Sequence, residues 1–429
     1  MSKEKVAVVG LGYVGLPLAC LLADSGFQTI GVDVDRNKLE KLRQGISPIE
    51  GNEPGLAELV DKVADDGSLT PTDKMSDVVS CDAIFICVDT PLNAANRPDL
   101  TILINVTREL SKFVRKGMML SFESTLPPGT CRDRLVPLLE QGSGLKAGTD
   151  FSVVHCPERV MPGKLLGNMR SVERVLGGID AQSIKKGAYF YSKVVRAELH
   201  PTDLLSAEIC KTTENAYRDV QIAFANEVAL LCEQVGGDAY EVRRLVNTCP
   251  YRDMHIPGSG VGGHCLPKDS WLLMSSAPFA EPRVMPAARE INERMPIHLA
   301  DIAVQLIKRC KVPDPKVAVM GLSFLRDSDD TRHSPAIPVI DALMKEAKVV
   351  VHDSFAREAH NAPLVRSMEE ALKGADCVVF VTDHSEYAKL DLAKVKELMR
   401  TPNLVDGRNV FNAADCRRRG FTYAGIGKG

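Results

Sequence analysis

Residues 5–15 read KVAVVGLGYVG, in which a β-branched run passes directly into the pattern Gly-x-Gly-x-x-Gly. The run at 5–9 predicts a buried parallel strand, and a helical pattern follows from 16 to 25. A second strand is predicted at 28–32, and Asp33 stands after it. Glycines between a strand and a helix, with an acid about 20 residues further on, make the complete dinucleotide-binding motif. We therefore expect a Rossmann-type domain to begin here.

The glycine loop and the acid have separate tasks in such a domain. Gly10 allows the tight turn, Gly12 lets backbone amides approach the pyrophosphate, and Gly15 lets the helix pack on the sheet. Asp33 would accept hydrogen bonds from the adenosine ribose and repel a 2′-phosphate, which favours NAD over NADP. The alternative, a turn acid that binds no ligand, fits the surrounding motif less well. The loop residues assigned to the cofactor are Gly10, Gly12, Tyr13, Val14 and Gly15.

Three further buried strands are predicted in the first third of the chain, each running into polar residues. They are 82–88, followed by Asp89 and Thr90; 118–122, followed by Glu123, Ser124 and Thr125; and 151–155, followed by Cys156, Glu158 and Arg159. Open α/β sheets bind ligands at the carboxyl ends of their strands, so these residues are candidates for a binding site.

The last third of the chain repeats this architecture. The run at 316–322 resembles 5–11, and 376–383 resembles 82–89. The glycine pattern is broken at 323–325, so we expect the second copy to bind something other than the dinucleotide, or nothing. The predicted fold is α/β, with two Rossmann-like doubly wound domains joined by a central helical region with one long helix. The predicted domain boundaries are 1–202, 203–312 and 313–429.

One long helix is predicted from Asp203 to about Gln234, because this stretch has neither proline nor glycine before Gly236. Its wide apolar surface suggests packing between domains or a dimer contact. Lys211 and Asn215 lie one turn apart on this helix and could address the same ligand atom. An ordinary exposed pair is the alternative, and spacing alone favours it.

A glycine-rich loop at 257–269, PGSGVGGHCLPKD, places one cysteine beside a lysine and an aspartate. Such a loop can wrap closely over a ligand and present the Cys265 thiol to it, with the charges of Lys268 and Asp269 nearby. The alternative is a flexible surface loop with an incidental cysteine. The loop on its own favours neither interpretation.

Composition excludes several classes of function. A chain of 429 residues, 45% hydrophobic and 25% charged, is of a soluble globular type and long enough for two or three domains. The net charge of −3 gives no electrostatic case for nucleic acid or an anionic membrane. No apolar run approaches the ~20 residues that span a bilayer, and no signal peptide is predicted. The twelve cysteines show no CxxC pair and no zinc spacing, so we expect no metal site and a reducing, cytoplasmic location.

Together these motifs resemble the nucleotide-sugar 6-dehydrogenases, the family of UDP-glucose dehydrogenase and UDP-N-acetylmannosamine dehydrogenase. The resemblance covers nearly the whole chain, and its motifs run in the family's order. They lie at 10–15, 124–130, 157–159, 207–215, 262–269 and 330–335. The resemblance implies that NAD binds the first domain, that a UDP-sugar binds the last, and that the chain forms a homodimer or a higher homo-oligomer.

The resemblance also implies a four-electron oxidation at C6 of the sugar. NAD takes a hydride to leave an aldehyde, the Cys265 thiolate adds to it, a second NAD oxidises the thiohemiacetal to a thioester, and water releases the uronic acid. In the family, the residues matching Lys211 and Asn215 hold the C6 oxygen and stabilise its developing charge. The family placement thus reverses the preference for an ordinary exposed pair.

Other roles follow from the same resemblance. The residues matching Asp269 and Thr125 position a water that moves protons, and the one matching Glu158 assists hydrolysis as a base. Arg332 resembles an arginine that reaches the cofactor phosphates, and Arg252 one that reaches the neighbouring subunit's substrate, which would make the dimer obligatory. The remaining implied contacts are Thr90, Thr125 and Lys268 for the cofactor, and Glu158, Arg159, Val160, Lys211, Asn215, Tyr251, His255 and Gly262 for the substrate.

Two departures from the family pattern bear on the substrate. The segment 158–164 lacks the second glutamate of UDP-glucose dehydrogenases, and His264 precedes the cysteine in place of serine. Both are similar to the branch that acts on UDP-N-acetylhexosamines. We expect UDP-N-acetyl-D-mannosamine, with UDP-N-acetylglucosamine, UDP-N-acetylgalactosamine and UDP-glucose as alternatives. The other departure is Leu325, where relatives often have a lysine; Arg326 is the candidate to replace it.

Two other functions were weighed. A single-step NAD-linked hydroxy acid dehydrogenase shares the first domain, but it needs neither Cys265 nor a second nucleotide-type domain. A non-catalytic nucleotide-sugar sensor would be expected to lose the nucleophile or its partners, and these are all present.

Overall fold

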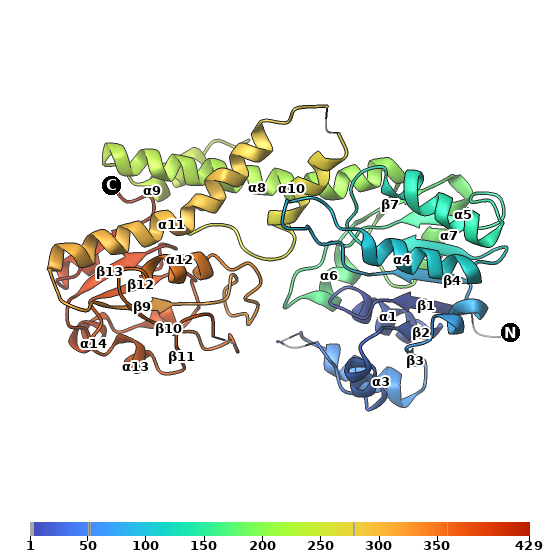
Figure 1. Cartoon of the computed structure of the whole chain (residues 1–429), viewed down its shortest axis with the longest axis horizontal. Coiled ribbons are helices and arrows are strands. Elements are labelled where there is room, and N and C mark those ends of the chain that lie inside the picture. Colours follow the sequence, from blue (N-terminus) through green and yellow to red (C-terminus); the bar gives the residue numbers. More distant parts are fainter. Residues whose placement is uncertain (1–3, 50, 52, 278, 358) are drawn as a thin grey trace. The chain divides into compact units, whose positions relative to one another are not determined.

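The chain folds into two units in the computed structural model, one built on a mainly parallel sheet and the other on a fully parallel sheet (Figure 1). The structure describes residues 4–49, 51, 53–277, 279–357 and 359–429. Unit 1 consists of residues 1–214 and 271–280, and unit 2 of residues 215–270 and 281–429.

Strand β1 (Lys5–Val9) lies inside an eight-stranded sheet in unit 1, with the order β3-β2-β1-β4-β5-β6-β7-β8. The other strands are β2 (Gln28–Val32), β3 (Leu69–Thr72), β4 (Ala83–Ile86), β5 (Met119–Phe122), β6 (Ser152–His155), β7 (Arg174–Gly178) and β8 (Leu199–Asp203). All neighbours pair in parallel except β6 and β7, which are antiparallel. Strands β4, β5 and β6 are buried throughout, as expected for a sheet covered on both faces.

Two apolar clusters cover the two faces of this sheet. One packs beneath α1 (Gly15–Asp24), α3 (Leu56–Asp65), α6 (Leu165–Ser171) and α7 (Ala181–Tyr191). The other packs beneath α4 (Thr101–Leu110) and α5 (Val136–Ser143). Helix α2 (Arg36–Arg43) follows β2 and begins at Asp35, whose side chain accepts the amides of Asn37 and Lys38. Because β1, β4, β5 and β6 pair in parallel, their carboxyl ends lie together along one edge of the sheet.

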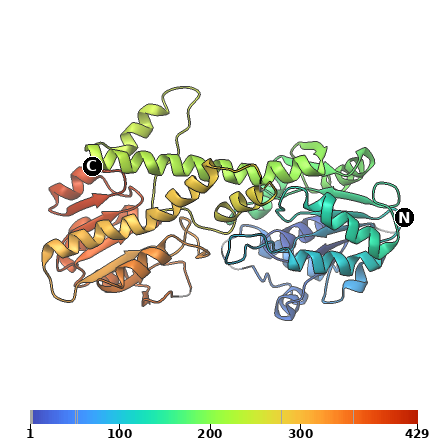
Figure 2. The same cartoon turned by 45° about the horizontal axis from the view of Figure 1, so that its top comes forward.

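Unit 2 repeats the doubly wound order in a six-stranded parallel sheet, β11-β10-β9-β12-β13-β14. Its strands are β9 (Lys316–Met320), β10 (Lys348–His352), β11 (Leu364–Val365), β12 (Cys377–Phe380), β13 (Asn403–Asp406) and β14 (Thr422–Gly425). Its helices include α11 (Val284–Cys310), α12 (Ala336–Leu343), α13 (Met368–Leu372), α14 (Leu392–Leu398) and α15 (Ala413–Arg418). Helix α11, gold in Figure 2, packs against β12, β13 and β14. The predicted duplication of the Rossmann-like architecture is confirmed.

Helix α8 (Leu204–Val235) is the predicted long helix, and the division between the units falls within it, after Glu214. It starts one residue later than predicted, because Asp203 is the last residue of β8. Strand β4 is shorter than the predicted 82–88, because the chain leaves the sheet after Ile86. The domain boundaries placed after 202 and 312 remain predictions. Among the described residues, no helix combines the length and apolar character needed to cross a membrane.

Candidate functional site

The glycine loop of unit 1 follows β1 and lies beside the carboxyl ends of β2 and β4. Gly10 has a φ of +91°, and a Cβ atom there would lie 2.6 Å from the carbonyl oxygen of Cys87. A Cβ atom on Gly15 would lie 1.8 Å from the carbonyl oxygen of Gly10, so α1 can approach the loop only without a side chain here. A Cβ atom on Gly12 would meet open space. These are the steric features that a loop built to receive a pyrophosphate requires.

Asp33, the residue predicted to bind the ribose, is itself hydrogen-bonded to this loop. Its Oδ2 accepts the amide of Leu11 at 2.8 Å and the ammonium of Lys38 at 2.8 Å, and its Oδ1 accepts the amide of Asp35 at 3.0 Å. Burial acts to raise the pKa of Asp33, but Lys38 and the backbone amides outweigh it and hold that pKa below its usual range. Sequence reasoning missed Lys38; its position in the first turn of the helix after β2 was the available signal.

The loop after β5 is fixed from two sides. The hydroxyl of Thr90 donates to the carbonyl of Thr125 at 2.7 Å. On the other side, the buried Glu208 of α8 accepts the amides of Gly129 at 2.6 Å and Cys131 at 2.7 Å. Burial raises the pKa of Glu208, and the two amides oppose that effect. The loop that carries Thr125 is therefore tied to the helix that carries Lys211.

Glu158 lies nearly buried in the loop after β6 and accepts the amide of Val160. Burial raises the pKa of Glu158, while Arg174, Lys211 and backbone amides oppose the rise. A buried carboxyl group with a raised pKa is a candidate for a base.

Arg159 is paired with other groups of unit 1. Its guanidinium binds the carboxylate of Glu214 on α8, with Nε 3.1 Å from Oε2, and its Nη1 donates to the carbonyl of Glu173 at 2.7 Å. It therefore fixes the Glu158 loop to α8. Its predicted contact with substrate remains a prediction.

The cysteine of the glycine-rich loop belongs to unit 2 and immediately precedes α10 (Leu266–Ser275), and its side chain is exposed. The carbonyl of Cys265 accepts the amides of Lys268 at 3.1 Å and Asp269 at 2.9 Å, so the residue forms the first turn of that helix. The partial positive charge at a helix N-terminus favours a thiolate there.

Asp269 is fully buried behind the cysteine. Its Oδ2 accepts the side-chain amide of Asn215 at 2.5 Å, and its Oδ1 lies 3.9 Å from the ammonium of the buried Lys268. Asn215 belongs to α8, one turn beyond Lys211. The structure thus brings together three of the predicted site residues of unit 2, Cys265, Asp269 and Asn215.

The glycines before the cysteine are needed for close packing. A Cβ atom on Gly262 would lie 2.5 Å from Cβ of Phe324, and one on Gly263 would lie 2.8 Å from its ring. The amide of Gly263 donates to the carbonyl of Arg332 at 2.9 Å. The guanidinium of Arg332 binds Asp330 through two hydrogen bonds, of 2.9 and 2.6 Å. The loop is therefore packed onto the segment that carries the predicted phosphate arginine.

Three predicted substrate residues lie in the exposed segment before this loop. Tyr251 is 86% exposed, and Nη1 of Arg252 donates to its carbonyl at 2.9 Å. Nε2 of His255 lies 3.2 Å from Oε1 of Gln221. Nothing within unit 2 tests their contact with a substrate, so these assignments remain predictions.

Arg326, the candidate replacement for the family lysine, binds Asp383 through Nε at 3.1 Å and also through Nη2. Arg408 approaches the other oxygen of the same carboxylate at 3.4 Å. Sequence reasoning missed Arg408, because neither residue spacing nor a motif connects it with Asp383.

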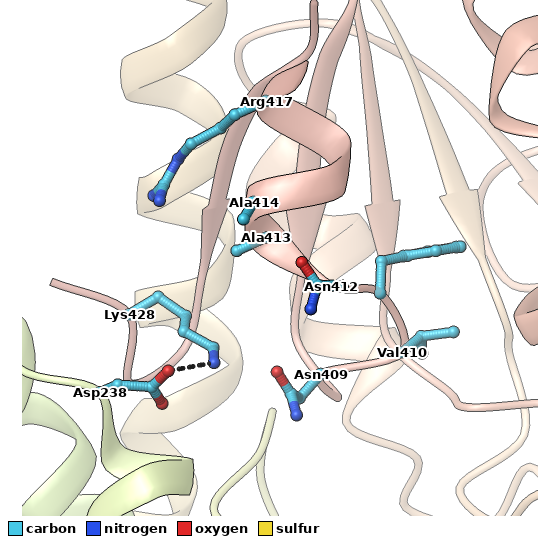
Figure 3. A pocket seen from close by; sticks show the side chains of 9 residues that line it. Asp238, Asn409, Val410, Asn412, Ala413, Ala414, Arg417 and Lys428 are labelled. Atoms are coloured by element: carbon cyan, nitrogen blue, oxygen red, sulfur yellow. Dashed lines mark hydrogen bonds and ion pairs between the residues drawn. The ribbon is translucent and has the colours of Figure 1, made fainter. Parts of the chain in front are cut away.

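A hollow of about 530 Å³ in unit 2 lies apart from these groups (Figure 3). Its walls include Asp238 and Lys428, joined by an ion pair of 2.7 Å, together with Asn409, Asn412 and Arg417. None of these five is a predicted site residue.

Comparison with known proteins covers almost the complete chain. Residues 4–195, 205–294 and 318–413 match the NAD binding, central and UDP binding domains of the UDP-glucose/GDP-mannose dehydrogenase family. A UDP-N-acetyl-D-mannosamine dehydrogenase of Pyrococcus horikoshii is 37% identical over 430 residues, which cover 99% of each chain. An NDP-N-acetyl-D-galactosaminuronic acid dehydrogenase of Ralstonia solanacearum is 34% identical, over 95% of this chain and 96% of that protein. The solved structure of a UDP-D-ManNAc dehydrogenase from Pyrococcus horikoshii superposes with a TM-score of 0.92 at 36% identity, over 99% of this chain and 100% of the other.

Proposed function

The chain belongs to the UDP-glucose/GDP-mannose dehydrogenase family of NAD-dependent oxidoreductases, and on this basis we propose that it oxidises C6 of a UDP-N-acetylhexosamine to the uronic acid. The preferred substrate is UDP-N-acetyl-D-mannosamine. The observation that carries the proposal is the arrangement around Cys265, an exposed thiol at a helix N-terminus with the buried Asp269 and its hydrogen-bond partner Asn215 behind it.

Cys265 is the nucleophile of the proposed reaction. Its thiolate adds to the C6 aldehyde to give a thiohemiacetal, and loss of hydride from this adduct leaves a thioester. Hydrolysis breaks the carbon–sulfur bond, and water supplies the oxygen of the carboxylate. NAD bound to the first domain would supply the hydride acceptor for both oxidations.

The charge that develops on the C6 oxygen needs a cation and a hydrogen-bond donor. Lys211 supplies the ammonium and Asn215 the amide, one turn apart on α8. Because Asn215 already donates to Asp269, its orientation is set before substrate binds. Asp269 and Thr125 would position the water that moves protons, and Glu158 would act as the base that assists thioester hydrolysis.

The NAD-binding domain supplies the cofactor contacts. The steric fit of Gly10, Gly12 and Gly15 matches a loop that admits a pyrophosphate, and Asp33 stands at the end of β2 to accept the ribose hydroxyls. Tyr13, Val14 and Thr90 line the same edge of the sheet in the proposal. Lys268 and Arg332 complete the proposed cofactor contacts.

The choice of substrate rests on sequence and on named relatives. The segment 158–164 lacks a second glutamate, and His264 precedes the nucleophile. The relatives of Pyrococcus and Ralstonia described above carry names that refer to N-acetylated sugars. The acetamido group at C2 is bulkier than a hydroxyl, so the two classes of sugar require different packing there. The glucosamine and galactosamine epimers and UDP-glucose are the substrates to be compared.

We also propose that the enzyme works as a homodimer through α8. Tyr217, Phe224 and Leu231 follow one another at seven-residue spacing on this helix, and each is more than half exposed. Large apolar side chains repeated along one line of a helix suit a contact with a second copy. A cytoplasmic location is proposed as well, since twelve cysteines without a CxxC pair suit a reducing compartment.

The stoichiometry of NADH tests the proposed chemistry. We expect two NADH per molecule of UDP-N-acetyl-D-mannosamine oxidised, and lower kcat/KM with its epimers and with UDP-glucose. One NADH per sugar, or equal use of UDP-glucose, would contradict the proposal. The Cys265→Ser variant should lose steady-state uronic acid formation by at least about a thousandfold, as expected for loss of a covalent nucleophile. Cys249→Ser, which changes another exposed cysteine, is the matched control and should retain activity.

A further inference from the structure

A buried polar cluster in unit 1 is left unused by the proposed chemistry. Nη2 of Arg174 donates to Oε2 of Glu123 at 2.6 Å, and both side chains are 2% exposed or less. The hydroxyl of Tyr191 donates to the other oxygen of Glu123 and lies 2.6 Å from Oγ of Ser121. Burying an ion pair is costly unless further hydrogen bonds accompany it, so this cluster calls for an explanation.

Arg174 joins the two loops that carry Thr125 and Glu158. The same Nη2 that binds Glu123 also donates to the carbonyl of Cys156 at 2.9 Å. Glu123 stands two residues before Thr125, and Cys156 stands two residues before Glu158. One guanidinium nitrogen thus binds the side chain of Glu123 and the backbone carbonyl of Cys156. Each of these residues lies two positions before a proposed catalytic residue.

The antiparallel turn of β7 explains how Arg174 reaches this position. Gly178 pairs with Val154, and Gly177 pairs with His155, so the start of β7 lies beyond the carboxyl end of β6. Arg174 is the first residue of β7. In an all-parallel sheet the first residue of this strand would lie at the opposite edge, away from the candidate site.

Opposite charges converge on Glu158 in this cluster. The titratable groups that act on it or respond to it are Arg174 from β7, Lys211 from α8, Glu123 after β5, Cys156 from its own loop, and Cys87 after β4. His155 at the end of β6 responds to the same cations, and burial lowers its pKa to about 4, so it is neutral at physiological pH. Burial acts to raise the pKa of Glu123, and the ion pair with Arg174 acts to lower it.

The ion pair with Glu123 occupies only one nitrogen of the Arg174 guanidinium. Its Nε and Nη1 have no hydrogen-bond partner within the described part of the chain. Its guanidinium carbon also lies 5.2 Å from the ring centroid of Tyr191. A buried guanidinium with two unpartnered nitrogens exerts its field over the surrounding low-dielectric region, which includes Glu158.

We propose that Arg174 and Glu123 are a pair of positioning residues with opposed electrostatic effects on Glu158, Arg174 favouring its carboxylate form and Glu123 opposing it. The inference rests on the proposed role of Glu158 as the base for thioester hydrolysis. Arg174 also fixes the spacing of the Thr125 and Glu158 loops. Neither positioning residue touches substrate.

The pH dependence of uronic acid formation tests this inference, because the two residues should move it in opposite directions. In Arg174→Met, loss of the cation should shift the acid limb of kcat upward by about one pH unit or more, which is about a tenfold loss of rate on the acid side. In Glu123→Gln, loss of the anion should shift the same limb downward. Arg174→Lys keeps the charge and should restore most of the limb position while leaving kcat reduced.

Three further measurements keep the outcomes distinct. Glu158→Gln should remove the acid limb altogether; if the limb persists, the proposed role of Glu158 fails, whatever the other variants do. If Glu158→Gln removes the limb but the Arg174 and Glu123 variants leave it in place, or move it the same way, the present inference is overturned. Glu173→Gln removes an exposed carboxylate next to Arg174 and should leave the limb unchanged. If Arg174→Met fails to fold, Glu123→Gln decides the question. In a ¹³C carboxyl NMR titration of the cofactor-free Glu123→Gln variant, Glu158 must titrate at lower pH than in the parent protein.

Discussion

Among the individual residues, the acid after the second strand performs the same backbone task in both units. Asp33 accepts the amide of Leu11 in unit 1. Asp353 follows β10 in unit 2 and accepts the amides of Leu322 at 2.7 Å and Ser323 at 3.0 Å. Asp353 is fully buried and also bound to His384 at 3.1 Å, so it cannot present an oxygen to a ribose. The duplicated acid is therefore structural in unit 2, whereas in unit 1 it can serve the loop and the cofactor together.

These two roles of Asp33, binding the loop and binding the cofactor, predict the effect of Asp33→Asn. The variant loses the negative charge that binds Lys38 and repels a 2′-phosphate, and it weakens charge-assisted bonds worth ~1.5–3 kcal/mol. We expect the KM for NAD to rise by roughly tenfold or more and the preference for NAD over NADP to fall, with a smaller change in kcat. Steady-state kinetics with both cofactors measure this. Asp35→Asn changes the neighbouring helix cap and should leave the cofactor preference as it was.

At the level of helices and loops, α8 gathers functional side chains because its first turns lie against the carboxyl edge of the first sheet. Glu208 binds the loop after β5, and Glu214 binds Arg159 from the loop after β6. Lys211 lies between them on the same helix. The part of the helix backbone that carries Lys211 is therefore fixed on both sides to the loops that carry Thr125 and Glu158.

The Glu208 anchor can be tested by Glu208→Gln. Each oxygen of the carboxylate accepts one backbone amide, and glutamine has an NH2 donor in place of one of these oxygens, so Gly129 or Cys131 would lose its acceptor. A buried donor left unsatisfied costs ~1–3 kcal/mol, and we expect the free energy of unfolding to fall by that amount. The effect on kcat should exceed the effect on KM for NAD, because the glycine loop is not involved. Denaturant unfolding and steady-state kinetics provide the two values, and Glu241→Gln, which removes an exposed helix-surface carboxylate, provides the control. Unchanged stability would show that the anchor is not needed.

For the complete chain, the proposed dimer gives a direct prediction. Replacing Tyr217 and Phe224 together by glutamate places charges on the exposed line of α8. We expect a monomer by light scattering, and at least a tenfold loss of kcat/KM if Arg252 acts on the partner's substrate. Tyr189→Glu, at an exposed position on α7 of unit 1, should leave the oligomeric state unchanged. A double variant that remains dimeric would exclude α8 as the contact.

Much of the fold could be predicted from the sequence, and the site only in part. The strands at 5–9 and 28–32, the long helix and the duplicated α/β order were predictable, because buried strands, helices and glycine turns leave local patterns of hydrophobicity and backbone freedom. The proximity of Cys265, Lys268 and Asp269 was also local, since one helix turn holds them.

The contacts of the reactive groups with distant residues could not be predicted from local sequence patterns. Asn215 and Asp269 are 54 residues apart, Glu123 and Arg174 are 51 apart, and Glu208 and Gly129 are 79 apart. Each contact depends on strand order, on the antiparallel reversal of β7 or on the register of α8, and each gains its strength from burial. Periodicity and backbone sterics are properties of neighbouring residues and can be read along the chain. A shared low-dielectric environment exists only after distant segments have packed together, and that packing determined which carboxyl groups in this protein hold the backbone and which remain available for chemistry.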